Sequence, residues 1–193
     1  MEASDLNFYG LLECFQNFRW WVVVITLSLP HIFYAFAWLR SESFISICKA
    51  FKKIPINVFS GVAFILKGVQ FAAFGFWLFY NGQIFDINSL NFLKIIFAIM
   101  LICAGQFLNA AVYKTLGHDG VYYGIKFGKE VPWVEGFPFN IGIKSPQYTG
   151  CVLSIWGAIV LCSTPNQMAA GIIPMGVAWS LFYLISGIIE DYF

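Results

Sequence analysis

Residues 20–39 read WWVVVITLSLPHIFYAFAWL and contain no charged side chain. At about 1.5 Å per residue, a helix of this length crosses the roughly 30 Å hydrocarbon core of a bilayer. Tryptophans lie near both ends of the run, Trp20 and Trp21 at its start and Trp38 close to its end. Such a pair of aromatic belts is typical of a helix that reaches both headgroup layers. The run therefore predicts a membrane-spanning helix.

The composition of the whole chain agrees with this interpretation. The 193 residues are 60% hydrophobic and 11% charged, with a mean hydropathy of +0.75, whereas soluble domains are about 25% charged. Eleven Lys and Arg residues oppose ten Asp and Glu residues, which leaves a net charge of +1. The composition therefore predicts an integral membrane protein. It argues against a nucleic-acid partner, because no broad basic surface can form.

Four further apolar segments follow the first one. They cover residues 57–80, 90–113, 148–163 and 168–189, and Lys67 and Lys94 are the charges within the first two. The last two segments are separated by a turn at residues 163–166, so they form either two spans or a helical hairpin that dips into the bilayer. We therefore expect an all-α bundle of four to five transmembrane helices.

The N-terminal segment is too polar to cross a membrane. Between residues 6 and 18 its apolar side chains recur at helical spacing, opposite polar ones such as Glu13. This pattern predicts an interfacial helix that lies in the headgroup plane. Because the chain has no repeat or flexible linker, residues 1–193 are expected to form one membrane-embedded domain. The five cysteines are odd in number and scattered along the chain, so no metal site is predicted.

The basic residues in the loops predict the orientation. Four Lys and Arg residues lie between Arg40 and Lys53 and four between Lys114 and Lys144, whereas the connections at 81–89 and 164–167 have none. Cytosolic loops collect basic residues, so this alternation fits five crossings. It places the long third loop and the C-terminus together on the cytosolic face.

The third loop, residues 117–150, is unusual for a connector. It is rich in glycine, proline and aromatic residues, whereas a solvated linker is richer in Ser, Glu and Lys. Its composition suits backbone folded tightly at the interface, with the rings among lipid headgroups. The loop is the candidate site, although an aromatic loop that only rests on the membrane would have the same composition.

The loop also carries recognisable motifs. Residues 105–134 read GQFLNAAVYKTLGHDGVYYGIKFGKEVPWV, followed by Phe-Pro-Phe-Asn at 137–140 and Pro-Gln-Tyr-Thr-Gly at 146–150. In this order the motifs closely resemble those of the phospholipid N-methyltransferases, and most of all the small plant-type members that methylate phosphatidyl-N-methylethanolamine. The specific match covers residues 105–150, and the pattern of apolar segments extends it more loosely over the chain.

The resemblance implies an enzyme that transfers a methyl group from S-adenosylmethionine to the amine of a phospholipid. It implies a multi-pass protein of the endoplasmic reticulum membrane with its active site facing the cytosol. Family members bind the donor through a G-x-G motif, an R-x-P-x-Y-x-G motif and an acidic pair after the last helix. The corresponding residues are Cys103, Ala104, Gly105, Lys144, Pro146, Tyr148, Gly150, Glu190 and Asp191. Cys103 and Lys144 depart from the motifs, so Gly105 counts for more than Cys103.

The reaction needs a neutral amine placed behind the methyl carbon, so the protein must supply positioning and proton removal. Glu190 is expected to bind the donor and is a catalytic candidate, as is His118, which with Asp119 is a candidate proton acceptor. The candidate substrate-binding residues, which could face the developing methylammonium through cation–π attraction, are Tyr122, Tyr123 and Trp133.

Several of these residues have a structural alternative. Gly105 would let a ligand approach the backbone, but a small residue also packs membrane helices together. Lys144 would pair with the donor's carboxylate or reach lipid phosphate. His118 is a loop histidine of the kind usually found at the surface, and interfacial anchoring explains the aromatic residues equally well.

Two other functions share these features. An isoprenylcysteine carboxyl methyltransferase would use the same donor pocket, and a membrane scaffold or lipid transporter would keep the fold without catalysis. Transport is disfavoured because no span carries a paired set of ionisable groups. Lys67 lies near the middle of its span, where a charge costs about 2.5–3.5 kcal/mol, so we expect it to face the bundle interior or a water cavity.

Overall fold

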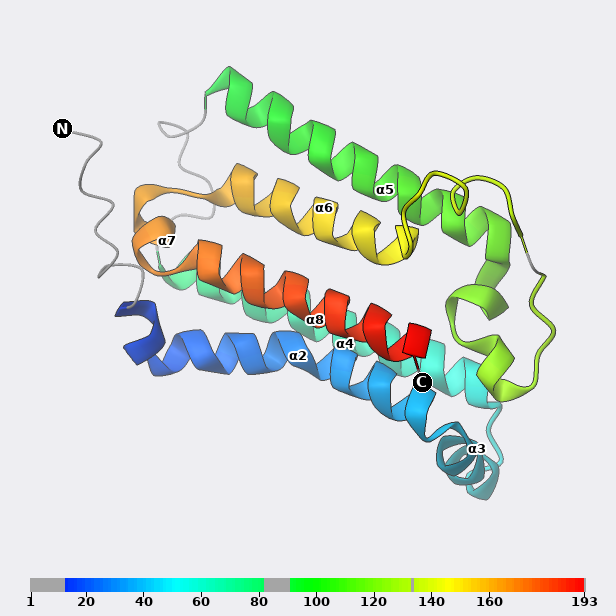
Figure 1. Ribbon diagram of the computed structural model, residues 1–193. Coiled ribbons are helices and arrows are strands. Elements are labelled where there is room, and N and C mark those ends of the chain that lie inside the picture. The colour runs from blue at the N-terminus through cyan, green and yellow to red at the C-terminus, as the bar shows by residue number, and fades with distance from the viewer. Residues whose placement is uncertain (1–12, 82–90, 133, 193) are drawn as a thin grey trace.

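The computed structural model describes residues 13–81, 91–132 and 134–192, and helix is the regular secondary structure in these ranges. Five long helices lie along one another (Figure 1). They are α2 (Phe18–Leu39), α4 (Pro55–Tyr80), α5 (Phe92–Val121), α6 (Pro146–Cys162) and α8 (Ile172–Tyr192). The shorter elements are η1 (Cys14–Gln16), α3 (Ser41–Ala50), η3 (Gly124–Phe127) and α7 (Pro165–Ala169). The predicted all-α bundle is confirmed.

Four of the long helices, α2, α4, α5 and α8, are long and apolar enough to cross a membrane, and α6 is a shorter apolar helix. Successive long helices run in opposite directions, and the α6–α7–α8 turn lies at the end of the bundle where α2 begins (Figure 1). The last two apolar segments therefore extend along the bundle beside the other helices. Because α6 is the shorter apolar helix, the choice between four and five crossings stays a prediction.

The helix boundaries differ most from the predicted ones in α3 and at the end of α5. α3 forms within the stretch that was expected to be a loop, because it buries Phe44 and Cys48 on one face. α5 continues beyond residue 113 to Val121, where the polar composition predicted a loop. The predicted interfacial helix lies mostly outside the described residues, and within them residues 14–16 form a 3-10 turn.

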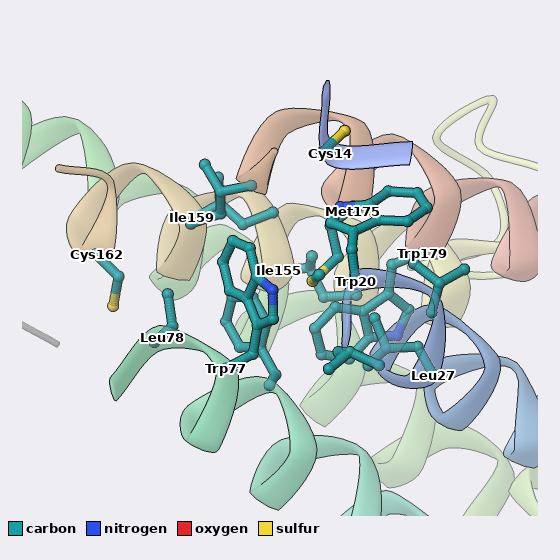
Figure 2. Packing of buried hydrophobic residues seen from close by; sticks show 14 of the residues in the cluster. Cys14, Trp20, Leu27, Trp77, Leu78, Ile155, Ile159, Cys162, Met175 and Trp179 are labelled. Carbon is teal, nitrogen blue, oxygen red and sulfur yellow. The ribbon is translucent and has the colours of Figure 1, made fainter. Parts of the chain in front are cut away.

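Large side chains from four helices form the main core. Trp20 of α2, Trp77 of α4, Ile159 of α6, and Met175 and Trp179 of α8 meet there (Figure 2), and each is at most 2% exposed. Because lipid is as apolar as these side chains, close packing rather than removal from water stabilises the contact. This core holds the four helices together. The other end of the bundle, where α2 stops at Leu39 and α4 begins at Pro55, is called the site end below.

α5 lies at the edge of the bundle and packs along α6 (Figure 1). Small residues make this contact close. A Cβ atom on Gly105 would lie 2.4 Å from both the carbonyl oxygen of Gly150 and the Oγ of Ser154. A Cβ atom on Gly157 would lie 2.8 Å from the carbonyl oxygen of Ala98. The two helices therefore approach through glycines, as membrane helices commonly do.

A glycine near the end of α5 redirects the chain. Gly117 has φ 66° and ψ −173°, a combination that essentially only glycine adopts. Beyond it the chain turns toward the bundle's site end (Figure 1), where η3 contacts α3 and α4. The break thereby brings Tyr122 and Tyr123 to the ends of α2 and α4.

Candidate active site

The carboxylate of Glu190 lies at the centre of the candidate site. It stands near the end of α8 and accepts hydrogen bonds from the hydroxyls of Tyr123 and Tyr148. These two hydroxyl oxygens lie 3.2 Å apart. Three segments that are far apart in the sequence therefore meet at one carboxylate. Hydrogen bonds to charged groups contribute about 1.5–3 kcal/mol each, so this contact is a strong link between α6, α8 and the chain before η3.

Tyr123 is held in an uncommon backbone conformation. Its φ of 59° and ψ of 27° lie in the left-handed region, which few non-glycine residues occupy and where strain is often associated with function. Its ring packs against Phe59 of α4 and Trp38 of α2, with ring centroids 4.7 Å and 5.0 Å away. This packing directs the Tyr123 hydroxyl toward Glu190.

A narrow cavity, which we call the slot, lies beside this cluster. Its volume is about 50 Å³, and α2, α4, α6, α8 and the end of α5 all contribute to its walls. Phe59, Ala63 and Lys67 line it from one face of α4, so it follows that helix for about 12 Å at roughly 1.5 Å per residue. Lys67 is the charged side chain among the described residues that line the slot. The expectation that Lys67 faces the bundle interior is confirmed.

A larger groove lies between α6 and α8. Its volume is about 610 Å³, and its walls are mostly apolar. At the site end it is lined by Lys144, Ser145 and Asp191. Tyr148 and Tyr183 line both this groove and the slot. These two rings therefore stand between the groove and the bundle interior.

An ion pair lies at the site end of the groove. Lys144 Nζ is 2.9 Å from Asp191 Oδ2, and the lysine side chain is 66% exposed. The hydrogen bond to Asp191 raises the pKa of Lys144 above its ordinary value. An exposed pair contributes little to stability. The pair places one positive and one negative charge side by side. A ligand with a free amino-acid end carries both a carboxylate and an ammonium, and such a pair can bind both.

The structure brings most of the predicted donor-binding residues to this end of the molecule. Tyr148, Glu190, Lys144 and Asp191 take part in the contacts above, and Pro146 is the first residue of α6. Of the predicted substrate-binding residues, Tyr123 bonds to Glu190 and Tyr122 lines the slot. Trp133 lies outside the described residues.

The G-x-G-like segment of α5 lies elsewhere. Cys103 and Ala104 are exposed on the outer side of α5, whereas Gly105 is buried against Gly150. These four residues are not among those that line the slot or the groove. The close backbone contact favours the packing role of Gly105 and Gly150, and their role toward a donor stays a prediction.

His118 and Asp119 pair with each other instead of joining the cluster. His118 Nδ1 lies 3.1 Å from Asp119 Oδ1, and both side chains are partly exposed. Neither lines the slot or the groove. The proton-acceptor role of His118 therefore stays a prediction without support from position.

Tyr183 lines both the slot and the groove, but no sequence motif indicated it. It lies seven residues before Glu190, which is about two helical turns, so both residues lie on one face of α8. Extending helical spacing backward from Glu190 would have found it. Within residues 13–81, 91–132 and 134–192, no group of three His, Cys, Asp or Glu side chains could hold a metal ion.

Comparisons with known proteins bear on this site. The model of a family described as phospholipid methyltransferase matches residues 93–192, which contain Tyr123, Tyr148 and Glu190. A protein of Arabidopsis thaliana named phosphatidyl-N-methylethanolamine N-methyltransferase is 32% identical over 170 residues, which cover 88% of this chain and 91% of that relative. No solved structure gives a significant match.

Proposed function

Because the chain belongs to the phospholipid methyltransferase family, we propose that it methylates phosphatidyl-N-methylethanolamine, and then the dimethyl lipid, to give phosphatidylcholine. Family membership makes it a membrane enzyme that carries methyl groups to a phospholipid nitrogen. The choice of acceptor rests on the named relative, which covers most of both chains. The observation that best supports the proposal is the meeting of Tyr123, Tyr148 and Glu190 at one end of the bundle.

We propose S-adenosylmethionine as the methyl donor, bound at the site end of α6 and α8. The residues there fit its polar groups. The Lys144–Asp191 pair offers both charges, so Lys144 would hold the donor's carboxylate and Asp191 its ammonium. Glu190 would bind a ribose hydroxyl or the same ammonium. When bound, the donor supplies an electrophilic methyl group on a sulfonium.

We place the lipid acceptor at the groove between α6 and α8. The groove is mostly apolar and has its polar residues at the site end, which suits an acyl chain with a headgroup at the membrane interface. Tyr148 and Tyr183 separate it from the slot. A headgroup at this position would reach the tyrosine cluster and could be held there by the ring faces, which attract alkylammonium groups.

We further propose that the site faces the cytosol from the endoplasmic reticulum membrane. The basic loops at 40–53 and 114–144 both adjoin the site end (Figure 1), and basic loops collect on the cytosolic side. The polar donor would then reach the site from water, and the lipid would reach it from the bilayer.

The direct test is methyl transfer by the purified full chain, with radiolabelled S-adenosylmethionine and several acceptors side by side. The acceptors are phosphatidylethanolamine, its monomethyl and dimethyl forms, and a prenylated cysteine. We expect label in the monomethyl and dimethyl lipids. Label in prenylated cysteine alone would instead indicate a carboxyl methyltransferase. A chain that labels none of these and does not bind S-adenosylhomocysteine by calorimetry would contradict the proposal.

A further inference from the structure

The proposed function leaves one charged group of the bundle without a role. Lys67 lies within α4 and lines the slot. It donates a hydrogen bond to the hydroxyl of Tyr183, and its Nζ lies 4.6 Å from the centroid of that ring. No carboxylate is among the described residues that line the slot. Lys67 thus lies deep in the helix bundle beside a tyrosine, without the acidic partner that such a lysine usually has.

The direction of α4 brings the lysine amine toward the active site. Side chains on a helix tilt toward its N-terminus, and α4 begins at the site end (Figure 1). The long side chain of Lys67 can therefore extend along the slot toward Tyr123 and Tyr148. Lys67, Tyr123 and Tyr148 line the same slot.

The surroundings of Lys67 favour an uncharged amine. The titratable groups that face it from the neighbouring elements are Tyr34 of α2, Tyr122 and Tyr123 before η3, Tyr148 and Cys151 of α6, and Tyr183 of α8. His31 of α2 packs edge-on against the Tyr183 ring, with centroids 4.5 Å apart. An ammonium among these neutral groups would be costly without a counter-charge. An uncharged amine has a lone pair that can accept a proton.

Glu190 is less suited to that task. Its carboxylate already accepts hydrogen bonds from two tyrosine hydroxyls. It is therefore engaged in holding Tyr123 and Tyr148 in place. A lysine amine, in contrast, has nearly the same intrinsic basicity as the alkylamine of the lipid headgroup.

We propose that Lys67 is the proton acceptor of the methylation reaction. This inference rests on the proposed function. The lipid arrives in the groove as an ammonium. One of its N–H protons passes by way of Tyr183, which lines both the groove and the slot and whose hydroxyl is hydrogen-bonded to Lys67, to the uncharged Nζ of Lys67. The lone pair freed on the lipid nitrogen forms the new N–CH₃ bond, while the electron pair of the breaking S–CH₃ bond stays on sulfur. Lys67 then returns its proton to water, so each turnover releases one proton.

Two substitutions separate a proton acceptor from a structural lysine. Lys67→Arg keeps a long side chain with N–H donors that can reach Tyr183, but guanidinium cannot act as a base because it stays protonated. Lys67→Met removes the amine and keeps most of the apolar stem. The matched control is Lys94→Met, which removes a span lysine at the opposite end of the bundle, where Lys94 donates to the Ser163 carbonyl.

We expect both Lys67 variants to bind S-adenosylhomocysteine like the wild type but to lose at least about 100-fold in turnover at pH 7, as general-base removal typically does. In Lys67→Met the residual rate should rise about tenfold per pH unit, because only the deprotonated lipid reacts. Near wild-type turnover in Lys67→Arg would overturn the inference and leave a structural role. The wild type is assayed in parallel. A wild type without methyl-transfer activity would contradict the proposed function and not the role of Lys67.

A measurement on the wild-type chain tests the inference without catalysis. In protein labelled with ¹³C at lysine Cε, the signal that disappears in Lys67→Arg identifies Lys67. We expect this signal at the shift of a neutral amine at pH 7. A Lys67 signal at the ammonium shift in the ligand-free protein would overturn the assignment.

Discussion

Two tyrosines hold one carboxylate at the site, and they come from opposite sides of the loop that precedes α6. Tyr123 precedes η3 and Tyr148 lies in the first turn of α6, yet both hydroxyls donate to Glu190. The contact therefore fixes the ends of the long loop against α8. We infer that it shapes the donor site as well as holding the charge.

Replacing Tyr148 with phenylalanine should weaken donor binding. Tyr148→Phe removes a hydroxyl that donates to Glu190 and leaves the ring that lines the groove. The loss of a hydrogen bond to a charged group corresponds to a roughly tenfold to 100-fold lower affinity. Calorimetric titration with S-adenosylhomocysteine measures it. Tyr113→Phe, at an exposed tyrosine of α5, is the control, and equal affinities of the two variants would contradict the role of Tyr148.

Lys144 should act on the donor and leave stability unchanged. Its pair with Asp191 is exposed, so Lys144→Met should leave the melting temperature nearly unchanged. It should weaken binding of S-adenosylhomocysteine by roughly tenfold, because the ligand carboxylate loses its cation. Lys144→Arg should retain or improve binding through its two-pronged geometry. Lys129→Met, in the same loop, controls for net charge, and a matching loss there would show a general electrostatic effect.

Among the helices, the α5–α6 contact depends on glycine most clearly. Gly105→Ala places a methyl group 2.4 Å from a backbone oxygen of α6, which a side-chain rotation cannot relieve. Overpacking of this kind costs about 1–3 kcal/mol. We expect a lower melting temperature in detergent.

The matched control is Gly61→Ala in α4, where an added Cβ meets nothing within 4 Å. That variant should melt at the wild-type temperature or slightly above it, since alanine has the higher helix propensity. If Gly105→Ala instead kept its melting temperature and lost only donor binding, Gly105 would be a ligand contact and the packing interpretation would be wrong.

The apolar spans could be predicted from sequence because hydropathy and length report burial in lipid directly. Helix α3 and the last turns of α5 could not, since their polar composition is equally typical of a loop, and only contacts such as those of Phe44 make them helical. Only part of the site could be predicted from the sequence. Motifs indicated Tyr148 and Glu190, but their meeting with Tyr123 depends on the break at Gly117 and on how α8 packs, which local patterns do not encode.

In the whole molecule, the basic loops and the site should lie on one side of the membrane. An impermeant maleimide can test this with single cysteines added at exposed positions. In sealed microsomes, Ser43→Cys in α3 and Lys129→Cys in the third loop should be labelled from the outside, and Asn166→Cys in α7 only after permeabilisation. The unsubstituted chain gives the background of its own cysteines. Labelling of residues 43 and 129 from opposite sides would contradict the bundle.

The proposed function depends on Glu190, held by Tyr123 and Tyr148, being part of the site that carries methyl groups to the lipid. A decisive experiment compares incorporation of radiolabelled methyl groups into choline lipid by purified wild-type protein and by Glu190→Ala at matched, folded concentrations. We expect the wild type to label the monomethyl and dimethyl acceptors and Glu190→Ala to lose this incorporation. An unchanged rate in Glu190→Ala would contradict this expectation.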